Sequence, residues 1–173
     1  VVSNSNELVI QYLFEMFKDT IDINQQNSDG STILTLASRN NMNVNVLRYL
    51  CDTFKDTINI NEQATKMFMA AATYNKNENV LQYICGTFKN IIDVNKQKQH
   101  GRTGIMGAVV NENIKVLHCL CDMFKDVIDI NKQNDFGHTA LMAAVEYSRD
   151  KNTLQYLCTT FKDTIDINKQ DEY

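Results

Sequence analysis

The sequence lacks proline and tryptophan altogether, and its 173 residues include only six glycines. Without proline, no helix can begin with the pre-set φ that this residue supplies at the first helical position. An excess of basic residues is also missing, because 17 Lys and Arg face 21 Asp and Glu, which gives a formal net charge of −4. Such a chain has no positive field to attract a phosphate backbone or an anionic membrane surface, so we expect no nucleic acid or lipid partner.

Motifs for catalysis, cofactor binding and membrane insertion are absent as well. Apolar runs such as 141–145 are far shorter than a bilayer requires. The first six residues show neither the basic start nor the apolar segment of a signal peptide. The sequence has no Ser/His/Asp pattern, glycine-rich phosphate loop or recurring pair of carboxylates. We therefore expect no enzyme activity, no cofactor and no small-molecule substrate.

What the sequence does contain is one eight-residue segment in five closely similar copies. FKDTIDIN occurs at 17–24 and at 161–168, while FKDTININ, FKNIIDVN and FKDVIDIN begin at Phe54, Phe88 and Phe124. Successive copies are separated by 37, 34, 36 and 37 residues, which is within the range of solenoid repeats. The spacing predicts a linear array of similar units.

Each unit contains two segments with helical periodicity. Apolar residues precede the repeated Phe at i, i+1, i+4 and i+5, as Val46, Leu47, Leu50 and Cys51 precede Phe54, which predicts an amphipathic helix. After it, Thr-Ile-Asp-Ile-Asn alternates apolar and polar residues and indicates a short extended arm. A shorter helix rich in small residues is expected near 32–38, 68–73, 103–109 and 139–145.

Three of the short helices follow a turn with glycine at a fixed place. Gly30, Gly101 and Gly137 each lie eight residues after the Asp of the arm, which fits a turn that needs a positive φ. The Thr two residues later is placed to cap the helix. The second full unit lacks both residues at these positions, so we expect its finger to be short or irregular.

Together these features resemble the ankyrin repeat family. DINQQNSDGSTIL, DVNKQKQHGRTGI and DINKQNDFGHTAL are similar to its Asp-x-Asn finger followed by Gly-x-Thr-Pro-Leu-His, and VLRYLC, VLQYIC and VLHCLC are similar to its second helix. The resemblance covers essentially the whole chain and implies an all-α solenoid of stacked helix-loop-helix repeats with short β-hairpin or extended fingers. Tetratricopeptide or HEAT units are the alternative, but neither explains Asp-Ile-Asn with a Gly eight residues later.

The predicted array is a single domain over residues 1–173. It comprises a partial repeat at 1–21, full repeats at 22–58, 59–92, 93–128 and 129–165, and the start of a further repeat at 166–173. The initial half-unit and the missing Met suggest an excerpt of a longer chain.

The units are longer than the usual ankyrin repeat of about 33 residues, and the excess lies at the end of the second helix. Three extra residues are nearly one helical turn, so we expect each second helix to be a turn longer. The rings expected to pack in this added layer are Phe54, Phe88, Phe124 and Phe161.

Five cysteines raise the question of a disulfide or a metal site. Four occupy one repeat phase: Cys51, Cys85, Cys121 and Cys158. Neighbouring helix axes about 8–10 Å apart are too distant for disulfides between them, so we expect free, buried thiols in an intracellular, cytoplasmic protein. His118 and Cys119 point away from Cys121 on a helix, and no second ligand pair completes a zinc site, so no metal is expected.

A row of tyrosines recurs on the polar side of the second helix, at Tyr12, Tyr49, Tyr83 and Tyr156, and is interrupted by Cys119. Packing between adjacent units is the favoured interpretation of this row. A lateral interaction strip is the alternative.

In the ankyrin family, binding residues lie beside the turn Gly and at the end of the first helix. The resemblance places them here at Ser28, Asp29, Ser31, Arg39, Tyr74, Asn75, Gln99, His100, Arg102, Asn111, Asp135, Phe136, His138, Glu146 and Tyr147. These positions differ between units while the core positions barely change, as on a partner-specific face of a uniform scaffold. Phe136 beside Tyr147 is the expected hot spot.

The sequence thus predicts a non-catalytic module that binds a partner protein through the concave face of its fingers and short helices. Two alternatives stay open. The segment could be a structural scaffold or spacer in a large assembly, with the Tyr and Phe rows in lateral contacts. It could also be the substrate-recruiting part of a larger enzyme.

Overall fold

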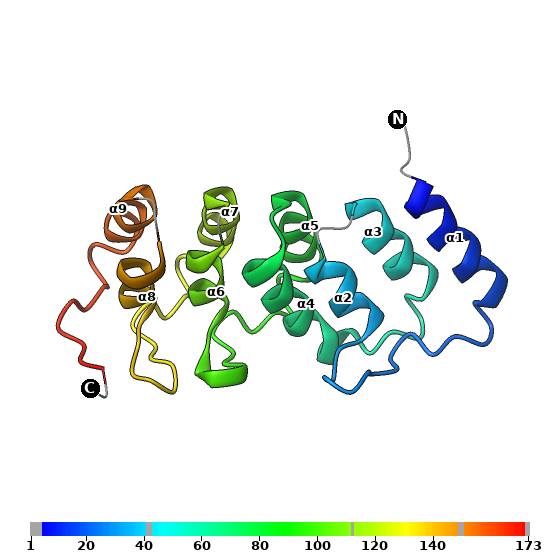
Figure 1. Cartoon of the computed structure of the whole chain (residues 1–173), viewed down its shortest axis with the longest axis horizontal. Coiled ribbons are helices and arrows are strands. Elements are labelled where there is room, and N and C mark those ends of the chain that lie inside the picture. Colours follow the sequence, from blue (N-terminus) through cyan, green and yellow to red (C-terminus); the bar gives the residue numbers. More distant parts are fainter. Residues whose placement is uncertain (1–4, 41–42, 112, 149–150, 172–173) are drawn as a thin grey trace.

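The computed structural model describes residues 5–40, 43–111, 113–148 and 151–171, which form a row of stacked helices in two layers (Figure 1). The outer layer contains α1 (Ser5–Phe17), α3 (Val44–Thr53), α5 (Glu78–Phe88), α7 (Ile114–Phe124) and α9 (Lys151–Thr160). The inner layer contains α2 (Ile33–Arg39), α4 (Ile60–Tyr74), α6 (Gly104–Val110) and α8 (Ala140–Tyr147). Neighbours within a layer contact one another, as α4 contacts α6 and α5 contacts α7. The prediction of an all-α repeat fold is confirmed.

A common turn built around the repeated Phe closes the outer helices. In all five copies the Phe carbonyl accepts the N–H groups of the third and fourth residues after it, as Phe54 accepts from Thr57 and Ile58 at 2.9 Å each. Four of the rings pack as predicted, because Phe54, Phe124 and Phe161 are buried and Phe88 is half-buried against the core. The recurring Phe-Lys motif therefore preserves a helix end together with its packed ring.

The arm after each turn joins neighbouring units through its Asn side chain. The Asn95 amide donates to the Val127 carbonyl at 2.7 Å, and its oxygen accepts the N–H of Asp129 at 2.8 Å. Asn24 and Asn131 make the same pair of bonds to the arm that follows each of them. Asp-x-Asn recurs because this amide supplies the hydrogen bonds that a β-strand would supply from its backbone.

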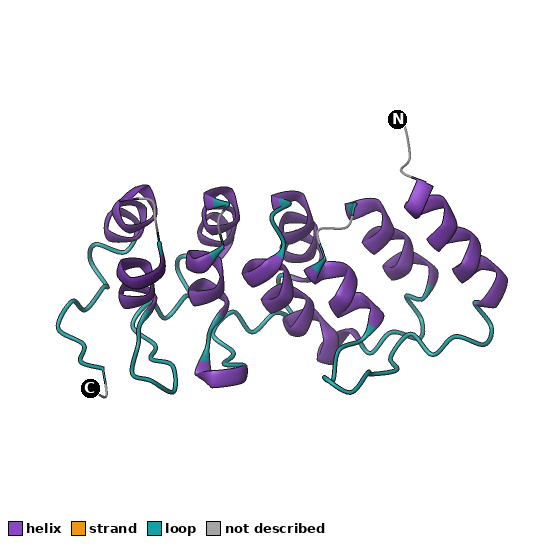
Figure 2. Ribbon diagram, in the orientation of Figure 1, coloured by secondary structure: helices purple, strands orange, loops and turns teal. Residues whose placement is uncertain are grey.

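The finger loops contain no strand in the described chain, so the β-hairpin part of the prediction is not found (Figure 2). We name these loops finger A (18–32), finger B (89–103) and finger C (125–139). Finger B includes a 3₁₀ turn at Gln99–Gly101. The expected positive φ is confirmed at the tip of each finger, where Gly30, Gly101 and Gly137 have φ of 72°, 67° and 77°. Side-chain amides satisfy the finger backbone in place of a strand ladder, as Gln97 bonds the Gly101 carbonyl at 2.8 Å.

The second full unit has a helix in place of a finger. We expected a short helix at 68–73 after a short or irregular finger, but α4 begins at Ile60, so only residues 54–59 connect it to α3. The segment NEQATKMFMAAA is rich in good helix formers and has no glycine to start a turn. Gln63, in the added part of α4, is buried, accepts a hydrogen bond from the Thr32 hydroxyl and donates to the Asn24 oxygen at 2.8 Å. Helix α4 therefore makes the contacts to finger A that a finger of the second full unit would otherwise make.

Threonine caps two of the three inner helices that follow a finger. Thr32 accepts the N–H of Thr35 and Thr139 accepts that of Met142, both at 3.3 Å. Thr103 precedes α6 in the same way, but it makes no capping bond. Its buried hydroxyl has no hydrogen-bond partner among the described residues.

Thr103→Val is expected to raise the free energy of unfolding by about 1 kcal/mol, because a hydroxyl buried without a partner is unfavourable. Thr139→Val is the matched control and should lower the same free energy by about 1 kcal/mol, since it removes a working cap. Urea unfolding followed by circular dichroism measures both. Equal losses of unfolding free energy in the two variants would contradict the finding that the Thr103 hydroxyl lacks a hydrogen-bond partner.

The cysteines are free, and most of the predicted ladder is buried. Burial raises the pKa of Cys51 to about 11 and that of Cys121 to about 12, so both thiols stay protonated at neutral pH. Cys158 departs from the prediction, because α9 stands at the end of the stack and leaves this side chain exposed. The described residues contain no group of three metal-ligating side chains.

Three members of the tyrosine row contact the preceding unit. The Tyr49 hydroxyl donates to the Gln11 carbonyl at 3.2 Å, and the guanidinium of Arg48 lies 5.4 Å from the centre of the Tyr83 ring. The rings of His118 and Tyr156 lie 4.1 Å apart. Tyr12 on α1 is 65% exposed. For every tyrosine of the row except Tyr12, these contacts support the interpretation as packing between units and not the interpretation as a lateral interaction strip.

Candidate functional site

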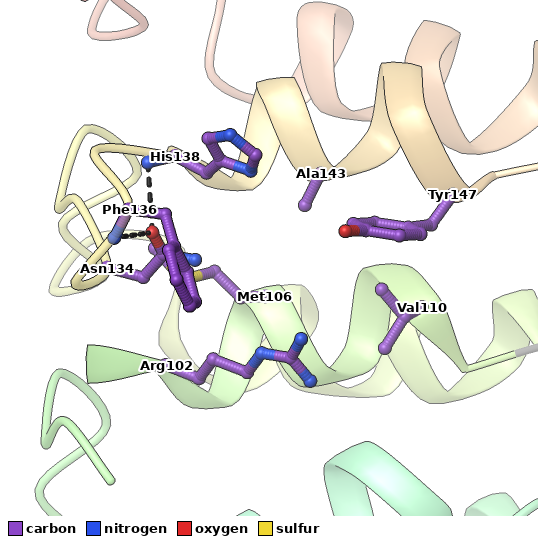
Figure 3. Close-up of a pocket in the computed structure, with 8 residues that line it drawn as sticks. All are labelled: Arg102, Met106, Val110, Asn134, Phe136, His138, Ala143 and Tyr147. Carbon is purple, nitrogen blue, oxygen red and sulfur yellow. Dashed lines mark hydrogen bonds between the residues drawn. The ribbon is translucent and has the colours of Figure 1, made fainter. Parts of the chain in front are cut away.

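Two grooves open on the face formed by the fingers and the inner helices, which we call the finger face. The Phe136 groove has a volume of about 310 Å³. It lies between α6, α8 and finger C, and is lined by Arg102, Met106, Val110, Asn134, Phe136, His138, Ala143 and Tyr147 (Figure 3). The wide groove, of about 650 Å³, lies over α2 and α4 between fingers A and B. It is lined by Ser28, Asp29, Ser31, Thr35, Arg39, Met69, Ala70, Thr73, Tyr74, Lys98, Gln99 and Arg102.

The turn in finger C holds Phe136 at the surface. The Asn134 side-chain oxygen accepts the N–H groups of Phe136 and His138, each at 2.9 Å, as the dashed lines in Figure 3 show. Gly137 completes the turn with its positive φ. The Phe136 ring is 41% exposed, and its centre lies 6.0 Å from that of His100 in finger B, in a stacked arrangement. A hydrogen-bonded turn thus presents a large apolar ring that the fold buries only in part.

The opposite wall of the Phe136 groove combines an aromatic ring with charges. Tyr147 at the end of α8 is 51% exposed, and a hydrogen bond with Glu146 raises the pKa of its hydroxyl. Glu146 also lies 3.3 Å from Nδ1 of His138, so this carboxylate joins the helix end to finger C. Met106, Val110 and Ala143 contribute the apolar lining in Figure 3. This arrangement suits an apolar side chain flanked by polar groups.

The wide groove exists because the second full unit has no finger. Fingers A and B stand on its two sides, and the small side chains of Ala70 and Thr73 on α4 lie between them. Tyr74 is 55% exposed, and the guanidinium of Arg39 lies 4.5 Å from the centre of its ring. Partial desolvation in the groove lowers the pKa of the Lys98 amine, and the positive charges of Lys66 and Arg39 lower it further.

Ten of the fifteen predicted residues line one of the grooves. His100 and Glu146 lie beside the Phe136 groove, through the ring stack and the His138 contact. The N–H of Asp135 bonds the His100 carbonyl at 3.1 Å and thereby links fingers B and C.

Asn75 and Asn111 lie inside the stack instead of on the finger face. They are 1% and 9% exposed. Asn75 donates to the Ser38 carbonyl at 2.8 Å, and Asn111 donates to the carbonyls of Ala72 and Asn75 at 3.1 and 2.9 Å. Both amides fasten one inter-helix loop to the preceding unit. Both side chains are buried and hydrogen-bonded within the stack, so they do not belong to the proposed binding surface.

Groove residues that the sequence did not predict include Lys98, Met69, Met106 and Val110. A signal for Lys98 was present, because it occupies the finger position that is Asn27 in finger A and Asn134 in finger C. The apolar residues carried no such signal, since their helical spacing is also that of core residues.

Comparison with known proteins agrees with this architecture. A family model described as ankyrin repeats (3 copies) matches residues 1–93 and again residues 68–171. No curated protein matches the sequence. In the described part of the chain, no helix is both long and apolar enough to cross a membrane. Two overlapping matches that span nearly the whole sequence, together with the paired helices and glycine turns, show that the chain belongs to the ankyrin repeat family, whose repeats generally mediate protein–protein interaction.

Proposed function

We propose that this chain is a non-catalytic module that binds a partner protein through its finger face, with the Phe136 groove as the centre of the contact. The observation that carries this proposal is the pair of exposed aromatic rings on the groove walls, Phe136 and Tyr147. Aromatic residues dominate the binding energy of protein interfaces when they are buried by a partner. Here both rings are held in place by local hydrogen bonds or a helix before any partner arrives.

The groove chemistry indicates the kind of contact. Its apolar wall can receive an aliphatic or aromatic side chain, while Arg102, His138 and Glu146 provide a polar rim. An apolar centre with a polar rim is the usual anatomy of a protein interface. The alternative of a scaffold with lateral tyrosine contacts has less support, because three of the four tyrosines contact the preceding unit.

The proposal is tested by capturing partners from native lysate with the wild type and with a double variant, Phe136→Ala combined with Tyr147→Ala. The matched control combines Tyr12→Ala with Met16→Ala, which also removes two exposed side chains, 65% and 60% exposed, but on α1, away from the fingers and the inner helices. For a partner bound by the wild type, we expect the first variant to raise the Kd by about 30-fold, which corresponds to about 2 kcal/mol at a hot spot. The control should leave the Kd within about threefold. Equal Kd values for both variants would contradict the proposal.

A further inference from the structure

Hydrogen bonds between α4 and finger A define the wide groove. Its floor is fixed by the contacts of α4 with finger A, in which buried Gln63 bonds Thr32 and Asn24. The N–H of Asn59 adds a third bond, to the Asn24 oxygen at 2.8 Å. Fingers A and B therefore stay apart because a helix, and not a third finger, fills the interval between them.

The groove carries an excess of positive charge in a chain that is acidic as a whole. Arg39, Lys98 and Arg102 line it, and Asp29 is the single acidic residue in its lining. Within the described residues, no carboxylate lies at ion-pair distance from any of these three cations. Lys66, by contrast, is paired with Glu62 at 2.7 Å. The three cations thus lie together without the acidic partner that surface cations often have.

The floor of the groove accommodates a polypeptide backbone. Ala70 and Thr73 are small, and Met69 adds a flexible apolar surface. Ser28, Ser31 and Gln99 at the edges offer hydrogen-bonding groups to a peptide. The shape and the charge together select an extended segment with negative side chains.

We propose that the wide groove binds an acidic, extended segment of a partner protein, with Arg39, Lys98 and Arg102 pairing its carboxylates. This proposal rests on the proposed function only in that the occupant is a protein. Nucleic acid is disfavoured as occupant, because three cations are few for a phosphate backbone and the chain carries a net charge of −4. The positive lining also complements an acidic segment in a way that the Phe136 groove, with Glu146 at its edge, does not.

Fluorescence anisotropy with two labelled peptide probes tests this inference. The aspartate probe is a short peptide of alternating aspartate and serine, and the asparagine probe has asparagine in place of each aspartate. At about 0.05 M salt, we expect the aspartate probe to bind at least about 10-fold more tightly than the asparagine probe. Arg39→Glu combined with Lys98→Glu should weaken the aspartate probe by at least about 10-fold. Arg39→Gln with Lys98→Gln, a milder change at exposed positions, should weaken it in the same direction.

Lys125→Glu combined with Lys162→Glu is the control, because it makes the same change in net charge at exposed lysines outside both grooves. We expect less than about a threefold loss for this variant. Equal binding of the two probes, including no binding of either, overturns the proposal, and so does an equal loss in the control. The Phe136→Ala and Tyr147→Ala variant should bind the aspartate probe like the wild type, so failure here and failure of the Phe136 groove are separate results.

Discussion

Phe68→Ala is expected to lower the free energy of unfolding by about 3–5 kcal/mol, because the ring is fully buried and its removal leaves a cavity between repeats. The ring packs edge-on against Phe124 of the outer layer, with centres 5.9 Å apart. On its other side lies α6, where Gly104 leaves room for the ring. Urea unfolding measures the loss. Phe136→Ala is the control, and this partly exposed Phe should change stability by less than about 1 kcal/mol.

The close approach of Phe68 to Gly104 can be tested in the same series. An alanine Cβ at position 104 would lie 2.4 Å from Cε1 of Phe68, so Gly104→Ala should destabilise the wild type by about 1–3 kcal/mol. Combined with Phe68→Ala, the same change should be tolerated, because the space beside α6 is then empty. A double-mutant cycle should give a coupling of about 1 kcal/mol or more. Strict additivity would show that the two residues do not share this space.

Asn111→Ala is expected to lower the free energy of unfolding by about 3 kcal/mol, because it leaves several buried backbone groups without partners. The side chain bonds the carbonyls of Ala72 and Asn75 and accepts the N–H of Asn113 at 3.0 Å. Urea unfolding again measures the effect.

Asn79→Ala is the matched control for Asn111→Ala. The side-chain amide of Asn79 is exposed and donates to the side-chain oxygen of the neighbouring N-cap residue Asn77 at 3.0 Å, so we expect a change below about 0.5 kcal/mol. Similar losses in both variants would contradict the structural role of Asn111. A stable Asn111→Ala protein that fails to bind its partner would return this residue to the binding surface.

Local features were predictable from the sequence where neighbouring residues suffice to determine them. The outer helices follow from apolar residues that recur in one helical phase, and the φ of Gly30, Gly101 and Gly137 follows from turn chemistry. The helix caps were predicted less well, because the Thr103 hydroxyl occupies the same sequence position as those of Thr32 and Thr139 but makes no bond. Capping depends on angles that the residue types alone do not set.

Most residues of the sequence-predicted binding surface lie along the two grooves, but the sequence did not indicate the grooves themselves. Phe136 and Tyr147 belong to different elements, and only the packing of α8 on α6 brings them to one groove. Asn75 and Asn111 resemble surface loop residues in sequence, yet the preceding repeat covers them. Cys158 shows the opposite case, since the phase that buries Cys85 and Cys121 leaves it exposed where the described stack ends.

The sequence by itself determined the repeat period, the helix phases and the recurring Asp-x-Asn and glycine positions, because these are short-range patterns repeated in every unit. The tertiary structure alone decided what lies between units. Helix α4 replaces a finger, and this separates fingers A and B across the wide groove. Burial and groove shape depend on which surface the neighbouring repeat covers, and that is set by stacking between residues that are more than thirty positions apart, as in the bonds of Asn24 and Asn75.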